Sequence, residues 1–157
     1  MARKKVTKPV DVATLPRSEC FLLCDFARAE NGKLDIVGGG WDNIAPQALP
    51  LVYPAFLAAK FVIPGAMAME SVSVRVALLD KNGRELSDPV IEGSLRGKPT
   101  FALEEFERSG LPEAPVLLAV GVQMQIAEPG ECRVRLFVEN EAIAETKFTV
   151  AEPPLVE

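Results

Sequence analysis

The sequence predicts an all-β fold, an immunoglobulin-like antiparallel β-sandwich of about eight strands. Apolar residues recur at every second position along three runs, at 72–78, 116–126 and 132–138, which is the period of a half-buried strand. Turn signals recur about every ten residues, and no helical pattern is long enough for the crossover of a βαβ unit. An up-and-down barrel needs more uniform hairpins than the break between residues 97 and 115 allows.

Length and composition predict one globular domain. The chain has 157 residues, of which 48% are hydrophobic and 25% are charged, and this balance is too apolar for intrinsic disorder. We expect a flexible basic tail at 1–18, a single β-sandwich at 19–151 and a short C-terminal tail at 152–157.

The first two predicted strands form a hairpin around Asn31-Gly32. Residues 20–26 are almost entirely apolar, and a second apolar run follows at 34–37. Asn-Gly between two such runs favours a two-residue turn, because both central residues adopt positive φ. The three glycines at 38–40 then end the second strand, since they have no side chains to pack.

Longer strands follow in the middle of the chain. Residues 55–63 are apolar on both faces apart from one lysine, which is typical of a central strand, and Pro64-Gly65 supplies a turn. Residues 71–78 place valines and a leucine on one face and serines and an arginine on the other. A second Asn-Gly turn at 80–84 leads to a short strand near 90–95.

The C-terminal part predicts three more strands after a segment without a clear period. Between 98 and 115, apolar residues are mixed with glutamates, so this segment forms either one short helix near 100–108 or a long crossover between sheets. The last two alternating runs flank a turn at Pro129-Gly130, and a final strand reaches Val150.

The charge distribution argues against a nucleic-acid-binding body. The first eight residues hold four positive charges, so the formal net charge of −5 leaves −9 for the rest of the chain; these charges are Arg3, Lys4, Lys5 and Lys8. Phosphate binding needs clustered Lys and Arg, and an acidic surface opposes it. We therefore expect no nucleic-acid contact except through this tail, which is more typical of a solubilising end.

Hydropathy and cysteine usage predict a cytoplasmic protein. The N-terminal region lacks the apolar run of a signal peptide, and no stretch approaches the roughly 18 apolar residues of a membrane span. The cysteines are Cys20, Cys24 and Cys132. On one strand Cys20 and Cys24 lie about 13 Å apart, beyond the roughly 7 Å that a disulfide tolerates. Reduced, buried thiols are therefore expected.

No residue pattern predicts catalysis, a cofactor or a metal site. The chain has no histidine, which removes the commonest general base and metal ligand. Residues 93–98 lack the spacing of a Walker A loop, and Pro99 stands where Ser or Thr would hold magnesium. The apolar neighbours of Cys20 and Cys24 raise thiol pKa values rather than activating a nucleophile. We predict a non-enzymatic protein.

Two candidate surfaces remain. The first is the loop of Gly39, Gly40, Trp41 and Asp42, where the indole could stack on a small ligand or a carbohydrate. The second consists of apolar residues on the outward register of predicted strands, which we expect to bind a protein partner or a second copy; they are Leu79, Leu117 and Phe137.

Residues 21–28 (FLLCDFAR) and 31–38 (NGKLDIVG) resemble a group of uncharacterised bacterial β-sandwich proteins of unknown function. The closing hairpin from Glu128 to Val150 is similar to theirs, so the resemblance covers most of residues 19–150. It implies the fold and carries over no functional residue. The leading hypothesis is a protein-interaction or scaffold module, and sandwich modules also serve in phage and other assembled particles. A small-ligand-binding sandwich is the alternative, and a small enzyme without histidine is the third.

Overall fold

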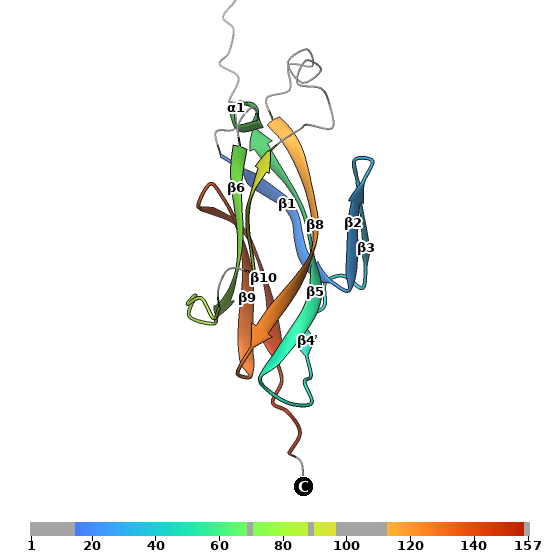
Figure 1. The fold of residues 1–157 in the computed structure, drawn as a ribbon, viewed down its shortest axis with the longest axis vertical. Coiled ribbons are helices and arrows are strands. Elements are labelled where there is room, and N and C mark those ends of the chain that lie inside the picture. Colours follow the sequence, from blue (N-terminus) through green and yellow to red (C-terminus); the bar gives the residue numbers. More distant parts are fainter. Residues whose placement is uncertain (1–14, 69–70, 88–89, 97–112, 156–157) are drawn as a thin grey trace, which may run out of the picture.

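Two β-sheets pack face to face, and a separate hairpin forms a third layer (Figure 1). The computed structural model describes residues 15–68, 71–87, 90–96 and 113–155. The elements in this part of the chain are β1 (Arg17–Cys24), β2 (Phe26–Glu30), β3 (Lys33–Val37), β4 (Asn43–Ile44), β5 (Leu51–Pro64), α1 (Gly65–Ala68), β6 (Ser71–Asp80), β7 (Ile91–Arg96), β8 (Glu113–Ile126), β9 (Gly130–Val138) and β10 (Glu141–Val150).

The first sheet has three strands in the order β1-β5-β8, and the second has five in the order β4-β10-β9-β6-β7. Neighbouring strands are antiparallel except β4 and β10, which pair in parallel over two residues. The hairpin of β2 and β3 packs over the outer face of the three-stranded sheet, against β5 and β8. The all-β sandwich predicted from the sequence is confirmed, and its immunoglobulin-like detail stays a prediction.

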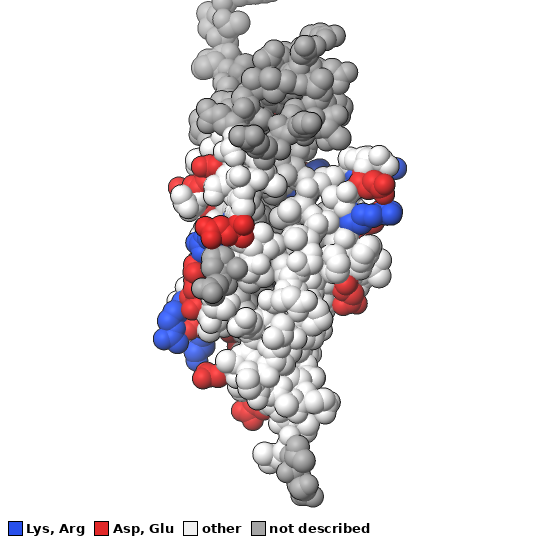
Figure 2. All heavy atoms as spheres, in the orientation of Figure 1, with Lys and Arg blue, Asp and Glu red and all other residues white. Residues whose placement is uncertain are grey.

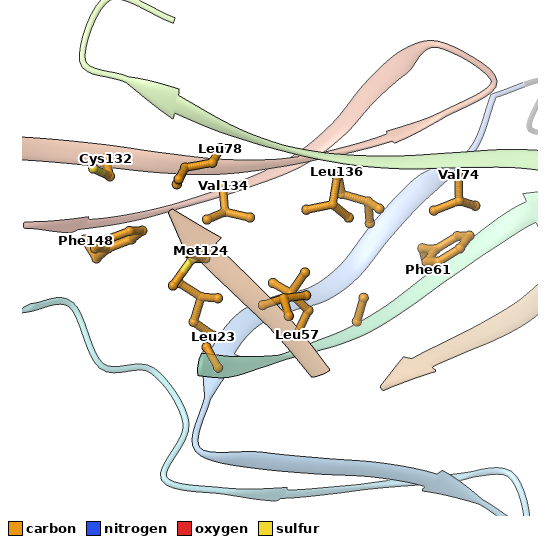
Figure 3. Close-up of a cluster of buried hydrophobic side chains, with 14 of the residues drawn as sticks. Leu23, Leu57, Phe61, Val74, Leu78, Met124, Cys132, Val134, Leu136 and Phe148 are labelled. Atoms are coloured by element: carbon orange, nitrogen blue, oxygen red, sulfur yellow. The ribbon is translucent and has the colours of Figure 1, made fainter. Parts of the chain in front are cut away.

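The main core lies between the two sheets. Its largest buried side chains come from both sheets and are at most 3% exposed; they include Leu23, Leu57, Phe61 and Met124 on one sheet and Val74, Leu78, Val134, Leu136 and Phe148 on the other. Figure 3 shows these side chains facing one another across the interior. Full burial of such a side chain contributes about 1.5–3 kcal/mol, so this cluster supplies most of the driving force for folding.

Both predicted Asn-Gly turns are present. Glu30 pairs with Lys33, and the two residues between them, Asn31 and Gly32, have φ of 52° and 71°, as a type I′ turn requires. In the second turn Gly83 has φ of 81°. There the carboxylate of Asp80 accepts hydrogen bonds from the backbone N–H groups of Asn82 at 2.8 Å and Arg84 at 2.9 Å. These bonds lower the pKa of Asp80, because they favour its charged form.

The chain breaks at Asp25, inside a run that the sequence predicts as one strand. The backbone N–H of Asp25 donates to the carbonyls of Val37 at 3.1 Å and Gly38 at 3.3 Å. These bonds turn the chain out of the three-stranded sheet, so β1 and β2 belong to different layers. This break and the two-residue β4 bring the described strands to ten rather than the expected eight or so. The helix expected near 100–108 and the basic tail lie outside the described residues.

Candidate functional site

The glycine run at 38–40 fastens the hairpin to β1. Gly38 and Gly40 have φ of +62° and +78°, a region that glycine adopts without the strain that most other residues have there. The N–H of Gly40 donates to the carbonyl of Leu23 at 2.9 Å. A Cβ at Gly38 would lie 2.0 Å from Asp25 Oδ2, and one at Gly39 would lie 2.9 Å from the Ile36 side chain. The second strand ends at Val37, as the glycine run predicted, and close packing explains two of the three glycines.

Trp41 belongs to the rim of the core. Its ring meets Tyr53 and Phe148 edge to face, with centroid distances of 5.6 and 5.8 Å, an arrangement that favours aromatic packing. The indole Nε1 is buried and has no hydrogen-bond partner among the described residues. An open depression is lined by Asp42, Asn43, Thr149 and Ala151, and Trp41 is not part of its lining. Tyr53 and Phe148 thus occupy two sides of the indole. Ligand binding by Gly39, Gly40, Trp41 and Asp42 stays a prediction.

The predicted partner surface does not form one patch. Leu79 is only 2% exposed, so its expected outward exposure is wrong. Leu117 and Phe137 are half-buried and lie on different sheets. The alternation along β6 ends at Ala77, since Ala77, Leu78 and Leu79 are all buried. Leu79 is paired across the sheet with Arg133 and bridges Glu85, and the aliphatic stem of an arginine covers neighbouring apolar surface.

The outer face of the five-stranded sheet is a network of paired charges. Arg133 contacts Glu131 at 2.8 Å and Glu145 at 3.6 Å, and Arg135 contacts Glu145 at 2.6 Å. The hydrogen bond from Arg133 lowers the pKa of Glu131. At the end of β9 the guanidinium of Arg75 lies 4.1 Å from the ring centroid of Phe137, a cation–π contact. The three arginines named here thus have partners on this face, as is usual for a solvated sheet.

The outer face of the three-stranded sheet has the opposite character. No charged residue occurs between Glu113 and Glu128, a stretch that holds nearly all of β8. Lys60 on β5 is paired with Glu19 at 2.6 Å. Figure 2 shows charged side chains gathered over the five-stranded sheet and on the hairpin, while the surface between them is almost uncharged in this view. The uncharged surface over β8 is thus flanked by charge on two sides.

The hairpin covers only part of this uncharged face. Ala27 and Leu34 pack on a second small core that contains Cys24, Ala58 and Ala119. At the base of the hairpin, however, two paired apolar residues face solvent: Phe26 is 46% exposed and Val37 is 60% exposed.

These residues continue onto β5. The Phe26 ring lies 5.2 Å from the ring of Phe56, and Val52, on the same face of β5, is 57% exposed. We call Phe26, Val37, Val52 and Phe56 the hairpin patch. It reaches β8 at Gly121, where a Cβ would lie 3.6 Å from the Phe56 ring. Of these residues Phe26, Val37 and Val52 are exposed and Phe56 is half-buried. Large apolar side chains exposed on one side of a sheet mark candidate binding surfaces.

The free edge of β8 is the other unusual feature. This 14-residue strand pairs with β5 along its whole length without a register shift, and no other described strand pairs with it. Exposed edges are usually protected by charge, shortness, bulges or proline. β8 has Glu113 and Pro115 at its start and none of these features in its remaining eleven residues. The other edges are protected: β1 carries Arg17, Glu19 and a register shift, β4 has two residues, and β7 has six with an exposed Glu92.

Reactive groups are sparse in the described part of the chain. The thiols of Cys24 and Cys132 are buried, and burial raises the pKa of each. Within the described ranges no three His, Cys, Asp or Glu side chains gather as metal ligands. None of the helices described is long and apolar enough to cross a membrane.

Fold and surface together define a class, a β-sandwich that has one unprotected sheet edge beside an exposed apolar patch. The chain belongs to the family of unknown function DUF6941, which matches residues 19–151. The expected resemblance to uncharacterised proteins is confirmed. No curated protein matches the chain.

A comparison with solved structures finds Pseudomonas fluorescens alkylpurine DNA glycosylase AlkC bound to DNA containing an abasic site analog. The similarity covers 84% of this chain and 30% of that one, with 13% identity and a TM-score of 0.40. This chain therefore spans under a third of the length of the glycosylase chain, and a likeness at this level implies nothing about activity.

The sequence contained one signal for this surface. The absence of charge between Glu113 and Glu128 is visible without a structure. Its importance depends on β8 being at the edge of its sheet, and strand order cannot be read from a local pattern. The hairpin patch was hidden for a related reason, because residues 20–26 look like one buried strand until the break at Asp25 is known.

Proposed function

We propose that this protein is a non-enzymatic protein-interaction module that accepts an extended polypeptide strand at the free edge of β8. The observation that carries this proposal is the long, regular and uncharged edge of β8, beside sheet edges that all have protection. Strand addition to such an edge is a recurring mode of peptide recognition, in which main-chain hydrogen bonds provide affinity and alternate side chains provide specificity. We place the module in the cytoplasm because its described cysteines are free thiols, which persist in a reducing compartment.

The energetics indicate what kind of strand fits. About eight main-chain hydrogen bonds at a net 0.5–1.5 kcal/mol each provide roughly 4–12 kcal/mol. Association costs about 4–15 kcal/mol, so backbone pairing alone is marginal. Apolar contacts must supply the difference, and the hairpin patch offers them on the outer side of β8. We therefore expect the bound strand to carry aliphatic or aromatic side chains at alternate positions and no charge at its centre.

A peptide selection tests the proposal. A random peptide library is selected on the purified protein, and affinities of the selected peptides are measured by fluorescence anisotropy. The test variant carries Gln123→Lys and Gln125→Lys, both at exposed positions of β8. The control is Ser73→Lys, at an exposed position of β6, which has neighbours on both sides.

We expect the selected peptides to share alternating apolar residues, to bind the double variant at least tenfold more weakly, and to bind the control as they bind the native protein. Hydrogen exchange should slow at β8 amides when a peptide is bound. The proposal fails if no peptide is selected and light scattering shows the protein to be a monomer, or if the selected peptides bind the native protein and the double variant equally.

A further inference from the structure

We infer that the strand accepted by β8 is β8 of a second copy, paired antiparallel around a twofold axis to form a continuous six-stranded sheet. The strand order would be β1-β5-β8-β8-β5-β1. This inference rests on the proposed function and names its partner. A twofold contact uses the same surface on both copies, so one unprotected edge is sufficient for a closed dimer.

Charge favours this occupant. The chain beyond its first eight residues carries −9, so two copies repel each other over most of their surfaces. Along β8 no charge occurs between Glu113 and Glu128. An antiparallel pairing centred on the strand therefore sets uncharged residues opposite uncharged residues over almost its full length. Like charges directly opposite each other would destabilise a sheet. The one charge of β8, Glu113, is at its first position, so a pairing centred on the strand does not place it opposite its own copy.

The faces of the two copies also match. Residues directly opposite in an antiparallel pair point to the same side of the sheet. Val116, Val120 and Met124 point into the core, and Leu117, Ala119 and Gly121 point outward. Any register that keeps these faces aligned joins the two apolar interiors and leaves both hairpins on the same outer side.

The hairpins give the pairing a second contact. Each hairpin packs over Ala119 and leaves Gln123 and Gln125 exposed. Antiparallel pairing puts the part of one β8 that its hairpin covers beside the exposed C-terminal part of the other β8. Phe26 contacts Phe56, which is paired with Gly121 near the middle of β8. The exposed Phe26 thus lies at the level of the axis, where the two hairpin patches approach each other.

A cysteine scan tests this geometry. Cysteine replaces each outward residue of β8 singly in a Cys20→Ser background, which removes the half-buried native thiol; the positions are Leu117, Ala119, Gly121, Gln123 and Gln125. At Gly121 a new Cβ meets the Phe56 ring at an ordinary 3.6 Å. Ser73→Cys on β6 is the control. Dimers formed by mild oxidation are quantified on non-reducing gels, and mass is measured by light scattering.

The expected result is one sharp maximum near the middle of β8. Opposed Cα atoms in an antiparallel pair lie about 4.5–5.5 Å apart, within the range for a disulfide. A cysteine two residues from the axis lies four residues, about 13 Å along the strand, from the same cysteine in the second copy. The two thiols should not cross-link. If the axis passes through Val120, the double variant Ala119→Cys with Gly121→Cys gives the maximum instead, because these residues then face each other.

Two outcomes separate the inference from the proposed function. If all positions cross-link no more than Ser73→Cys and light scattering gives a monomer, the second-copy inference is overturned. The proposed function would then stand if selected peptides bind the native protein more tightly than they bind the double variant with Gln123→Lys and Gln125→Lys. The partner would in that case be a different chain. Failure of both experiments removes both.

Discussion

Replacing Gly38 by alanine probes the contact that holds the hairpin against the sandwich. A non-glycine residue at φ of +62° costs about 1–2 kcal/mol. The new Cβ would also lie 2.0 Å from Oδ2 and 2.5 Å from Cγ of Asp25, so Asp25 has to move. Forcing an extra methyl group into an occupied site costs about 1–3 kcal/mol. We therefore expect Gly38→Ala to lower the free energy of unfolding by about 2–5 kcal/mol.

Gly40→Ala provides the matched control. Gly40 has φ of +78° and nothing within 4 Å of the position of a Cβ, so only the backbone cost of about 1–2 kcal/mol applies. The double variant Asp25→Ala with Gly38→Ala removes the two shortest contacts, those with the carboxylate, and keeps the contact of 3.0 Å to the Cβ of residue 25. Measured against Asp25→Ala, the Gly38→Ala change should then cost little more than Gly40→Ala.

Urea unfolding measures these differences. Trp41 is the only tryptophan and packs against Tyr53 and Phe148, so its fluorescence reports the loss of the fold. Equal losses of stability for Gly38→Ala and Gly40→Ala would refute the reasoning, because the clash with Asp25 is the difference between the two sites.

Three further predictions concern single side chains. Asp80→Asn should destabilise the protein at neutral pH. Because folding lowers the pKa of Asp80, the difference in stability from the native protein should fade as the pH falls below about 4. A pH-independent difference in urea midpoints would contradict this. A thiol reagent should label Cys20 in the folded protein and reach Cys24 and Cys132 only on unfolding, since burial shields both and raises their pKa values; rapid labelling of all three would contradict this. Trp41→Phe removes a buried N–H without a partner and keeps an aromatic ring, so circular dichroism should show a stability within about 1 kcal/mol of the native value, against about 3–5 kcal/mol lost for Trp41→Ala; a comparable loss in both would contradict it.

Local signals predicted the turns well. Asn31-Gly32 and Asn82-Gly83 form turns where the sequence places them. Asn31, Gly32 and Gly83 have positive φ, which glycine and asparagine adopt more readily than other residues. The alternation at 132–138 gave the correct inward set, with Val134 and Leu136 buried. In each case the pattern and its cause lie within about ten residues.

Other features depend on neighbours that are distant in the sequence. Leu79 occupies an outward position by alternation, yet it is buried because Arg133 lies beside it on the next strand. Phe26 continues an apolar run and is nonetheless 46% exposed, because hydrogen bonds from Asp25 to the glycine region turn the chain out of the sheet. Arg133 and the glycine region both lie outside the apolar runs that contain Leu79 and Phe26.

The amino-acid sequence by itself determined that this protein is an all-β sandwich with tight Asn-Gly turns, because period-two alternation and turn chemistry are local. It also determined that the run between Glu113 and Glu128 carries no charge. Only the tertiary structure decided that this run is an edge strand and that the hairpin leaves apolar residues exposed beside it. The reason is physical: an edge is defined by the hydrogen bonds a strand does not make, and these depend on the order in which distant strands assemble.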